Sequence, residues 1–407
     1  MDLQYFRLPN GIRLVHQQQA SQVAHCGIFI NAGTRDETLR EHGIAHFIEH
    51  TIFKGTEKRN LFQVLNRLEN IGADLNAFTS KEETCIYASF MSQYYDRTLE
   101  LFQDICFHSV FPDKEITKEK LVVLDEIRSY KDNPAEQILD DFEDFLFTGH
   151  PLGRNILGTS GSVRSISRNQ ILSFTGRNYQ PNNIVIASVG SISFAKLLKL
   201  VARHFSDQRA GSCTLDRAPF IPSGAASKSI RKKICQVHCV IGTAGYPFFD
   251  ERRIPLALLN NMLGGPILNS RLSLALRERN GLTYHNESNY TAFSDSGLVT
   301  IYFGTDPAQY ERALDLVYRE LKRIREQRLS TLQLHTIQKQ LIGQIVIARE
   351  SNISTMLAIG KSYLFQNRFE PVESIISKIE AVGSEQLLTI GNEIFNEAEL
   401  SILTFKP

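Results

Sequence analysis

Two histidines and a glutamate stand close together in the segment His46-Phe47-Ile48-Glu49-His50. His46 and His50 are four residues apart, so on a helix their rings project to the same side. Neutral imidazole nitrogens are good zinc ligands, and a catalytic zinc site keeps one coordination position open for water. Glu49 lies beside that position, where a carboxylate takes the proton of a water whose pKa the metal lowers toward about 7. The segment predicts a zinc site with hydrolytic chemistry.

A third protein ligand is needed, and Glu126 is the candidate. It lies in a predicted helix over residues 113–131 that also carries Glu119. Seven residues are about two helical turns, so the two carboxylates share one face. Acidic residues on a helix are often just solvated, and a His-x-x-Glu-His pentad also arises by chance on an amphipathic helix. The residue types alone therefore leave a structural role open for each of these side chains.

The surrounding elements alternate between strands and helices. Apolar spacing predicts helices over residues 43–54, 62–71, 95–108, 113–131, 135–147 and 168–178, and strands over 10–16, 24–33, 74–90 and 183–190. The second half repeats this order, with a strand over 237–245 and a helix over 254–263. Asn260 falls there where His46 falls in the first half, so the metal ligands have no counterparts. The repetition predicts a degenerate duplication of one α+β domain.

A chain of 407 residues is too long for one ordinary core. Residues 206–229 are rich in Ser, Ala, Gly and Pro without a sustained period, which is typical of a linker. We therefore predict a zinc-binding catalytic domain over residues 1–207, a linker over 208–228 and a homologous second domain over 229–407.

The composition is that of an ordinary soluble globular protein, with 42% hydrophobic and 22% charged residues. The net charge of +1 gives no electrostatic basis for binding nucleic acid or an anionic membrane. No signal peptide or membrane-spanning run is seen, so we expect a soluble, cytoplasmic protein. The six cysteines lack Cys-x-x-Cys spacing; Cys235 and Cys239 beside His238 leave a second metal site open, although buried free thiols are favoured.

The pentad continues through Thr51-Ile52-Phe53-Lys54-Gly55-Thr56, and this longer motif resembles the inverzincin metallopeptidases. That family includes pitrilysin, insulin-degrading enzyme and the mitochondrial processing peptidase, and the resemblance is strongest to its short bacterial, processing-peptidase-like members. Further matches cover nearly the whole chain, at residues 33–37, 72–79, 132–134, 149–154 and 178–183. The resemblance implies that Glu126 is the third zinc ligand and that Glu119 belongs to the same site.

The resemblance also implies how a substrate binds. The segment Asn76-Ala77-Phe78-Thr79 would form an edge strand to which an extended peptide adds as a further strand, with a plain structural strand as the alternative. Arg277 and Tyr284 match a pair that holds the substrate backbone and stabilises the oxyanion. With Glu49 and Glu119 they complete the implied catalytic set. Pro266-Ile267-Leu268-Asn269 departs from the more glycine-rich loop of the relatives.

The implied architecture is half of a clamshell peptidasome, in which two similar α+β domains each contain a mostly antiparallel sheet packed with helices. A second chain must complete the chamber, as a homodimer or as a heterodimer with a related chain that lacks the pentad. The implied activity is that of a zinc-dependent endopeptidase, which holds one Zn²⁺ per chain and hydrolyses unfolded peptides inside the closed chamber. Manganese or cobalt are alternative metals.

Two rival functions stay open beside this one. The first is a non-catalytic assembly subunit of the same family, which would be expected to lack an intact pentad. The second is a processing subunit with narrow specificity and an obligate partner chain.

Overall fold

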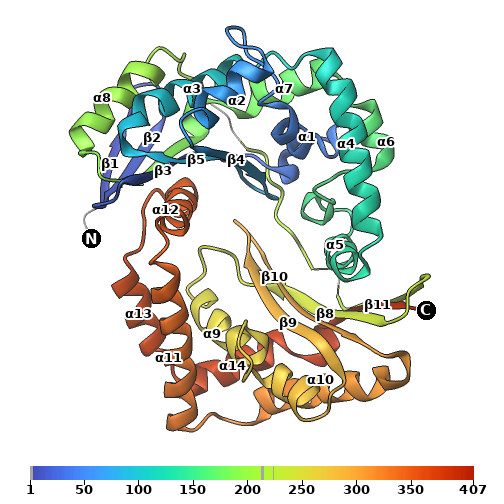
Figure 1. Cartoon of the computed structure of the whole chain (residues 1–407). Helices are drawn as coiled ribbons and strands as arrows, with labels where there is room; N and C mark the ends of the chain where they lie inside the picture. The colour runs from blue at the N-terminus through green and yellow to red at the C-terminus, as the bar shows by residue number, and fades with distance from the viewer. Residues whose placement is uncertain (1–2, 212–214, 223) are drawn as a thin grey trace. The chain divides into compact units, whose positions relative to one another are not determined.

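The computed structural model describes residues 3–211, 215–222 and 224–407. The chain forms two compact units, and neither is one continuous stretch of sequence. Unit 1 comprises Met1–Arg128, Arg154–Arg217 and Ile347–Glu370, and unit 2 comprises Ser129–Gly153, Ala218–Val346 and Pro371–Pro407. Each unit contains one sheet and the helices that cover it (Figure 1).

The sheet of unit 1 has six strands in the order β1-β2-β6-β3-β5-β4. All neighbours are antiparallel except β2 and β6. Residues 80–83 form a turn that divides the region expected as one extended stretch into β4 and β5. The strands are β1 (Leu3–Arg7), β2 (Arg13–Gln18), β3 (Val23–Ile30), β4 (Asp74–Thr79), β5 (Thr84–Met91) and β6 (Ile184–Gly190).

The sheet of unit 2 has five strands in the order β7-β11-β8-β10-β9. They are β7 (Ser227–Arg231), β8 (Val237–Gly245), β9 (Thr283–Ala292), β10 (Gly297–Thr305) and β11 (Ser401–Lys406). In chain order, β7 to β11 correspond to β2 to β6, and both the strand order and the position of the single parallel pair are then the same in the two sheets. The expectation of two similar α+β domains is confirmed.

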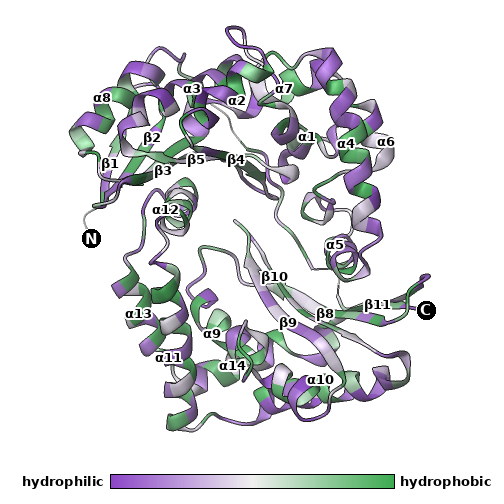
Figure 2. Ribbon diagram, viewed as in Figure 1, coloured by the Kyte–Doolittle hydropathy of each residue, from purple (hydrophilic) through white to green (hydrophobic). Residues whose placement is uncertain are grey.

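The helices form where apolar residues recur at helical spacing. On α8, for example, the buried residues are Leu197, Val201 and Phe205, each four residues from the next. Figure 2 shows hydrophobic and hydrophilic residues alternating along α8 and α10. The helices of unit 1 include α1 (Ile44–Thr51), α2 (Leu61–Glu69), α3 (Tyr95–His108), α4 (Asp113–Lys131), α6 (Ser160–Ser165), α7 (Arg168–Asn178) and α8 (Phe194–Phe205). The last three residues of α4 belong to unit 2. Those of unit 2 include α9 (Arg253–Gly264), α10 (Tyr310–Glu326), α11 (Thr331–Ala348), α13 (Val372–Glu380) and α14 (Ser384–Ile394). The last two residues of α11 belong to unit 1.

Each sheet is also covered by a helix from the other half of the sequence (Figure 1). In unit 1, α12 (Asn352–Gln366) packs Met356 and Ile359 into a cluster with Phe29 and Val185 of the sheet. The approach is close enough that a Cβ on Gly360 would lie 2.2 Å from the Phe29 ring, so only glycine fits there.

In unit 2, α5 (Pro134–Leu146) has the corresponding role. Its buried residues Ile138 and Phe142 form a cluster with Val240 of β8 and Phe405 of β11. The compact units thus differ from the two homologous halves of the sequence by the exchange of one helix each. Within the described residues, no helix combines the length and the apolar character that a membrane span requires.

Candidate metal centre

Helix α1 presents the pentad, and its first turn is held by a residue that precedes it. Gly43, the N-cap, has φ 88° and supplies no capping side chain. The Glu37 carboxylate instead accepts hydrogen bonds of 2.9 Å from both the Gly43 and the Ala45 backbone N–H groups. Glu37 is 4% exposed. Glu37 thus holds the start of α1, and the buried side chains of Ile44 and Phe47 hold the helix against the core.

The three predicted metal ligands converge on one another. His46 Nε2 lies 3.8 Å from Glu126 Oε1, and His50 Nε2 lies 3.4 Å from Glu126 Oε2. One possible ligand atom from each of the three residues lies within 4.8 Å of the other two. Among the described residues, this is the one cluster of its kind. Two ligands on one tetrahedral zinc at about 2.0–2.1 Å lie about 3.4 Å apart, so small adjustments would bring all three to bonding distance. Two imidazoles and a carboxylate fit a zinc ion.

Glu119 lies on the far side of His50 from Glu126. Its Oε2 is 3.4 Å from His50 Nδ1, and its Oε1 is 2.7 Å from Lys54 Nζ. A carboxylate at Nδ1 favours the tautomer in which that nitrogen carries the proton, which leaves the Nε2 lone pair toward Glu126. This geometry places Glu119 to orient His50, and Glu119 is not one of the three residues of the cluster that could hold a metal ion.

The electrostatics of the pentad follow from burial and from these contacts. Burial, with a smaller contribution from His50, lowers the pKa of His46 to about 4, so this ring is neutral at pH 7. Interaction with Glu126 raises the pKa of His50, and the same contact lowers the pKa of Glu126. Burial raises the pKa of Glu49, an effect partly offset by hydrogen bonding to Thr79.

The Thr79 contact brings the predicted substrate segment next to Glu49. Asn76, Ala77, Phe78 and Thr79 all lie on β4, which pairs with β5 and stands at the edge of the sheet. Asn76 is exposed and the other three are half-buried. An edge strand keeps backbone groups available for another extended chain, and this one ends beside the pentad.

Arg277 and Tyr284 lie in unit 2, where they contact each other. The Arg277 guanidinium carbon is 5.5 Å from the centre of the Tyr284 ring, and the tyrosine is 86% exposed. Arg277 lies in the last part of a π-helical turn over Ser273–Glu278, and Arg279 N, just after this turn, donates to Leu274 O. Such turns occur often at functional sites. A cavity of about 320 Å³ beside the pair is also lined by Gly264–Leu268.

Among the described residues of unit 2, no equivalent of the metal cluster is found. Asn260 lies on α9, the helix that corresponds to α1, and its side-chain amide donates to the Ser288 carbonyl oxygen at 2.9 Å. The alternative metal site near Cys235 is wrong. Cys239 is a buried free thiol, His238 Nδ1 lies 2.9 Å from the Tyr302 hydroxyl, and Cys235 is exposed because it precedes β8 in a loop.

Lys54 and Glu37 both lie at the site, and neither residue was assigned a role from the sequence. Lys54 follows His50 by four residues, as His50 follows His46, so its spacing carried a signal. Glu37 lies in the matched segment 33–37, but its role was not predicted, because its bonds to the start of α1 depend on how the intervening residues turn back.

Comparisons with known proteins agree with this geometry. Residues 13–160 match the family described as "Insulinase (Peptidase family M16)", and residues 165–341 match "Peptidase M16 inactive domain". A Bacillus subtilis protein named "Uncharacterized zinc protease YmxG" is 32% identical over 392 residues, which are 95% of this chain and 94% of that protein. A Streptomyces coelicolor protein, also named an uncharacterized zinc protease, is 30% identical over 397 residues, 95% of this chain and 86% of its own length.

Two solved structures share the fold. A protease from Helicobacter pylori has a TM-score of 0.94 at 20% identity, with both chains covered completely. A Pseudomonas fluorescens structure described as a peptidase M16 inactive domain has a TM-score of 0.93 at 20% identity and covers 100% of this chain and 98% of the other. The fold and the pentad define a short, two-unit metallopeptidase-like protein. The chain belongs to peptidase family M16.

Proposed function

We propose that this chain is a zinc-dependent endopeptidase that hydrolyses unfolded peptides. The observation that carries the proposal is the convergence of His46, His50 and Glu126, with Glu49 on the same helix and β4 ending beside it. One zinc ion per chain would be held by His46 Nε2, His50 Nε2 and the Glu126 carboxylate. Bound there, zinc would make a water molecule acidic and polarise the scissile carbonyl.

Glu49 would move the proton in this reaction. Its carboxylate would take a proton from the attacking water and deliver it to the nitrogen of the leaving amine. A base works best when its pKa lies near the working pH, and burial moves the pKa of Glu49 upward, in that direction. The Thr79 contact holds the carboxylate beside the end of β4.

The substrate would bind as an additional strand on β4, opposite β5. Binding of this kind reads mainly the peptide backbone, so selectivity for sequence should be loose. It also requires an extended chain, which favours unfolded peptides over folded proteins.

Arg277 and Tyr284 would hold the substrate backbone and donate to the negative charge that develops on the carbonyl oxygen. Their exposure and mutual contact leave both donors accessible. The family resemblance further suggests that two such chains close a chamber as a homodimer, with Arg277 and Tyr284 serving either their own zinc or that of the partner.

The test combines metal content with peptide hydrolysis. We expect the wild-type chain to bind about one zinc and to cleave an unstructured peptide library until a chelator removes the metal. Glu49→Gln should retain zinc and lose at least about a hundred-fold in kcat. Glu69→Gln, an exposed glutamate at the end of α2, is the matched control and should stay active.

Full hydrolysis by zinc-loaded Glu49→Gln would contradict the proposed mechanism. Activity that appears only with a second, different chain would favour the partner-dependent processing subunit. A zinc-loaded wild-type chain that cleaves nothing would favour the non-catalytic assembly subunit.

A further inference from the structure

Helices α1 and α4 face each other with a row of imidazole and amino side chains opposite a row of carboxylates. His46, His50 and Lys54 follow one another at intervals of four residues, the last in the turn that ends α1, and Glu126 and Glu119 lie two turns apart on α4. Glu126 contacts both histidines, and Glu119 contacts His50 and Lys54. The contact between Lys54 and Glu119, at 2.7 Å, is the shortest of the four. The predicted ligand set thus continues into a charged pair one turn further along.

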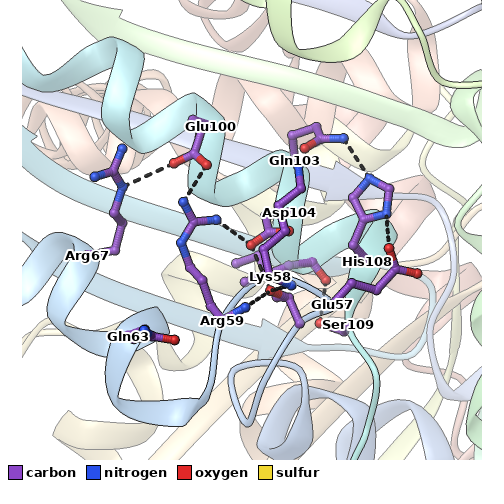
Figure 3. Close-up of polar contacts among 12 residues, drawn as sticks. Glu57, Lys58, Arg59, Gln63, Arg67, Glu100, Gln103, Asp104, His108 and Ser109 are labelled. Carbon is purple, nitrogen blue, oxygen red and sulfur yellow. Dashed lines mark hydrogen bonds and ion pairs between the residues drawn. The ribbon is translucent and has the colours of Figure 1, made fainter.

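The backbone around Lys54 is fixed independently of this pair. Lys54 N donates to Thr51 O at 3.0 Å, and Gly55 O accepts from Val110 N at 3.1 Å. Just beyond, the Thr56 hydroxyl donates to Asp104 at 2.8 Å, and Asp104 is only 1% exposed. Arg59 adds ion pairs to Asp104 and to Glu100 on α3 (Figure 3). Lys54 therefore starts from an anchored turn, which limits where its ammonium group can lie.

Glu119 needs such a partner because it is buried. The residue is 8% exposed, and a carboxylate removed from water is costly unless a charge or hydrogen bonds compensate it. Lys54 takes one carboxylate oxygen and leaves the other toward His50 Nδ1. Without the ammonium group, the carboxylate would be free to turn toward solvent, and His50 would lose the acceptor that orients it.

We infer that Lys54 is a positioning residue of the metal centre, acting through Glu119 to orient His50 and so to set the affinity for zinc. The inference rests on the proposed function, since it assumes that His50 binds the metal. The competing explanation is that the pair of Lys54 and Glu119 only fastens the end of α1 to α4.

The experiment is a double-mutant cycle read out as the zinc dissociation constant, measured by competition with a chromogenic chelator. Loss of an outer partner of a ligand typically costs 10–100-fold in metal affinity, so we expect about ten-fold for Lys54→Met and somewhat more for Glu119→Gln. The double variant should bind zinc within about three-fold of Glu119→Gln alone, because two residues that act through one path are not additive. The double variant also leaves no buried unpaired charge, so its zinc affinity can be measured even if Lys54→Met folds poorly.

Lys361→Met is the matched control. Lys361 on α12 forms a 2.8 Å ion pair with Glu83, which is also buried in unit 1. Its loss should lower the stability of the metal-free chain about as much as Lys54→Met does, while leaving the zinc affinity within about two-fold of wild type. Lys54→Arg, which keeps the charge, should restore most of the affinity.

Three outcomes would overturn the inference: zinc affinity unchanged in Lys54→Met, the same loss in Lys361→Met, or effects of Lys54→Met and Glu119→Gln that multiply in the double variant. A wild-type chain that binds no zinc would overturn the proposed function as well. A chain that binds zinc but hydrolyses nothing would overturn the proposed function alone, because the affinity cycle still measures the role of Lys54.

Discussion

Burial favours the neutral form of both His46 and Glu49, and therefore shifts their pKa values in opposite directions. The pKa of His46 falls to about 4, and the pKa of Glu49 rises. Neutral imidazole is the form that binds a metal, and a carboxylate with a raised pKa accepts a proton more readily. At the residue scale, the partly buried setting of α1 therefore prepares both side chains for the roles proposed for them.

Tyr284 offers a clean test of the oxyanion role because it is 86% exposed. Tyr284→Phe keeps the ring that contacts Arg277 and removes only the hydroxyl. Loss of one oxyanion donor typically costs about a hundred-fold or more in kcat, and we expect that loss with little change in KM. Steady-state kinetics on a fluorogenic peptide will measure it. A change in KM alone would show that the tyrosine serves binding and not the transition state.

The burial of His16 predicts that the stability of the fold depends on pH. The side chain is fully buried on β2, and burial lowers its pKa below the ordinary 6.5 despite contacts with the Ser188 and Ile192 carbonyl oxygens. Below pH 6.5 the unfolded chain binds a proton that the folded chain resists, so the free energy of unfolding falls as the pH falls. Above pH 6.5 both states are neutral and His16 contributes no slope.

Urea denaturation of the chelator-treated chain at pH 7.5, 6.5 and 5.5 will measure this slope. His16→Asn should be less stable overall, and its stability should fall less steeply below pH 6.5, by up to about 1.4 kcal/mol per pH unit. Parallel curves for wild type and variant would show that His16 is not the group responsible.

At the scale of elements, Glu37 fixes the start of α1. Glu37→Ala removes the acceptor of two backbone N–H groups, and we expect a loss of about 1–3 kcal/mol in unfolding free energy together with weaker zinc binding. Glu251→Ala is the matched control, because Glu251 precedes the corresponding helix α9 but is exposed. Its effect should stay within about 0.5 kcal/mol. Equal effects of the two variants in thermal and urea unfolding would rule out the anchoring role.

The sequence predicts those elements whose apolar residues recur locally. The helices expected over residues 95–108, 113–131 and 168–178 have these bounds in the structure, because Pro112 separates the first two and Ser167 caps the start of the third. The pentad and Glu126 were predicted from spacing and resemblance. The bonds of Glu37 and the pairing of Lys54 with Glu119 were not, because they depend on how two distant elements lie against each other.

The same reason explains why the exchange of α5 and α12 was not foreseen. Nothing in the pattern of α12 distinguishes Phe29 and Val185 from other apolar partners. Which sheet a helix covers is decided by tertiary packing, which periodicity does not encode.

At the scale of the whole molecule, the proposed homodimer can be tested in a way that distinguishes sites completed within one chain from sites completed by the partner. Glu49→Gln and Tyr284→Phe should each be nearly inactive alone. If Arg277 and Tyr284 serve the zinc of the partner, a mixed dimer of the two variants contains one intact site, and an equal mixture regains about a quarter of wild-type activity. If they serve their own zinc, no mixture regains activity. Activity assays on co-refolded variants, with size-exclusion chromatography coupled to light scattering for the mass, will decide.

The exchange of helices predicts how the halves behave when the chain is cut at the linker. Residues 1–217 alone leave the Phe29 and Val185 face of the first sheet without α12, and they display the apolar side of α5 without its own sheet. Extended apolar faces that are exposed to water favour aggregation. Each half produced alone should be insoluble, and co-expression of residues 1–217 with 218–407 should yield a soluble complex. Independent solubility of residues 1–217 would contradict this prediction.

The position of α12 in the chain also sets a schedule for biosynthesis. The first sheet receives its last strand, β6, at Gly190, but α12 begins at Asn352, roughly 160 residues later. At about 5–20 residues per second, a ribosome needs on the order of ten to thirty seconds to make that stretch. During this interval the apolar face of the sheet that α12 later covers stays exposed outside the ribosome. The nascent chain should therefore be a good client for chaperones that shield apolar surfaces, and the first unit should reach its protease-resistant state only after α12 has been made.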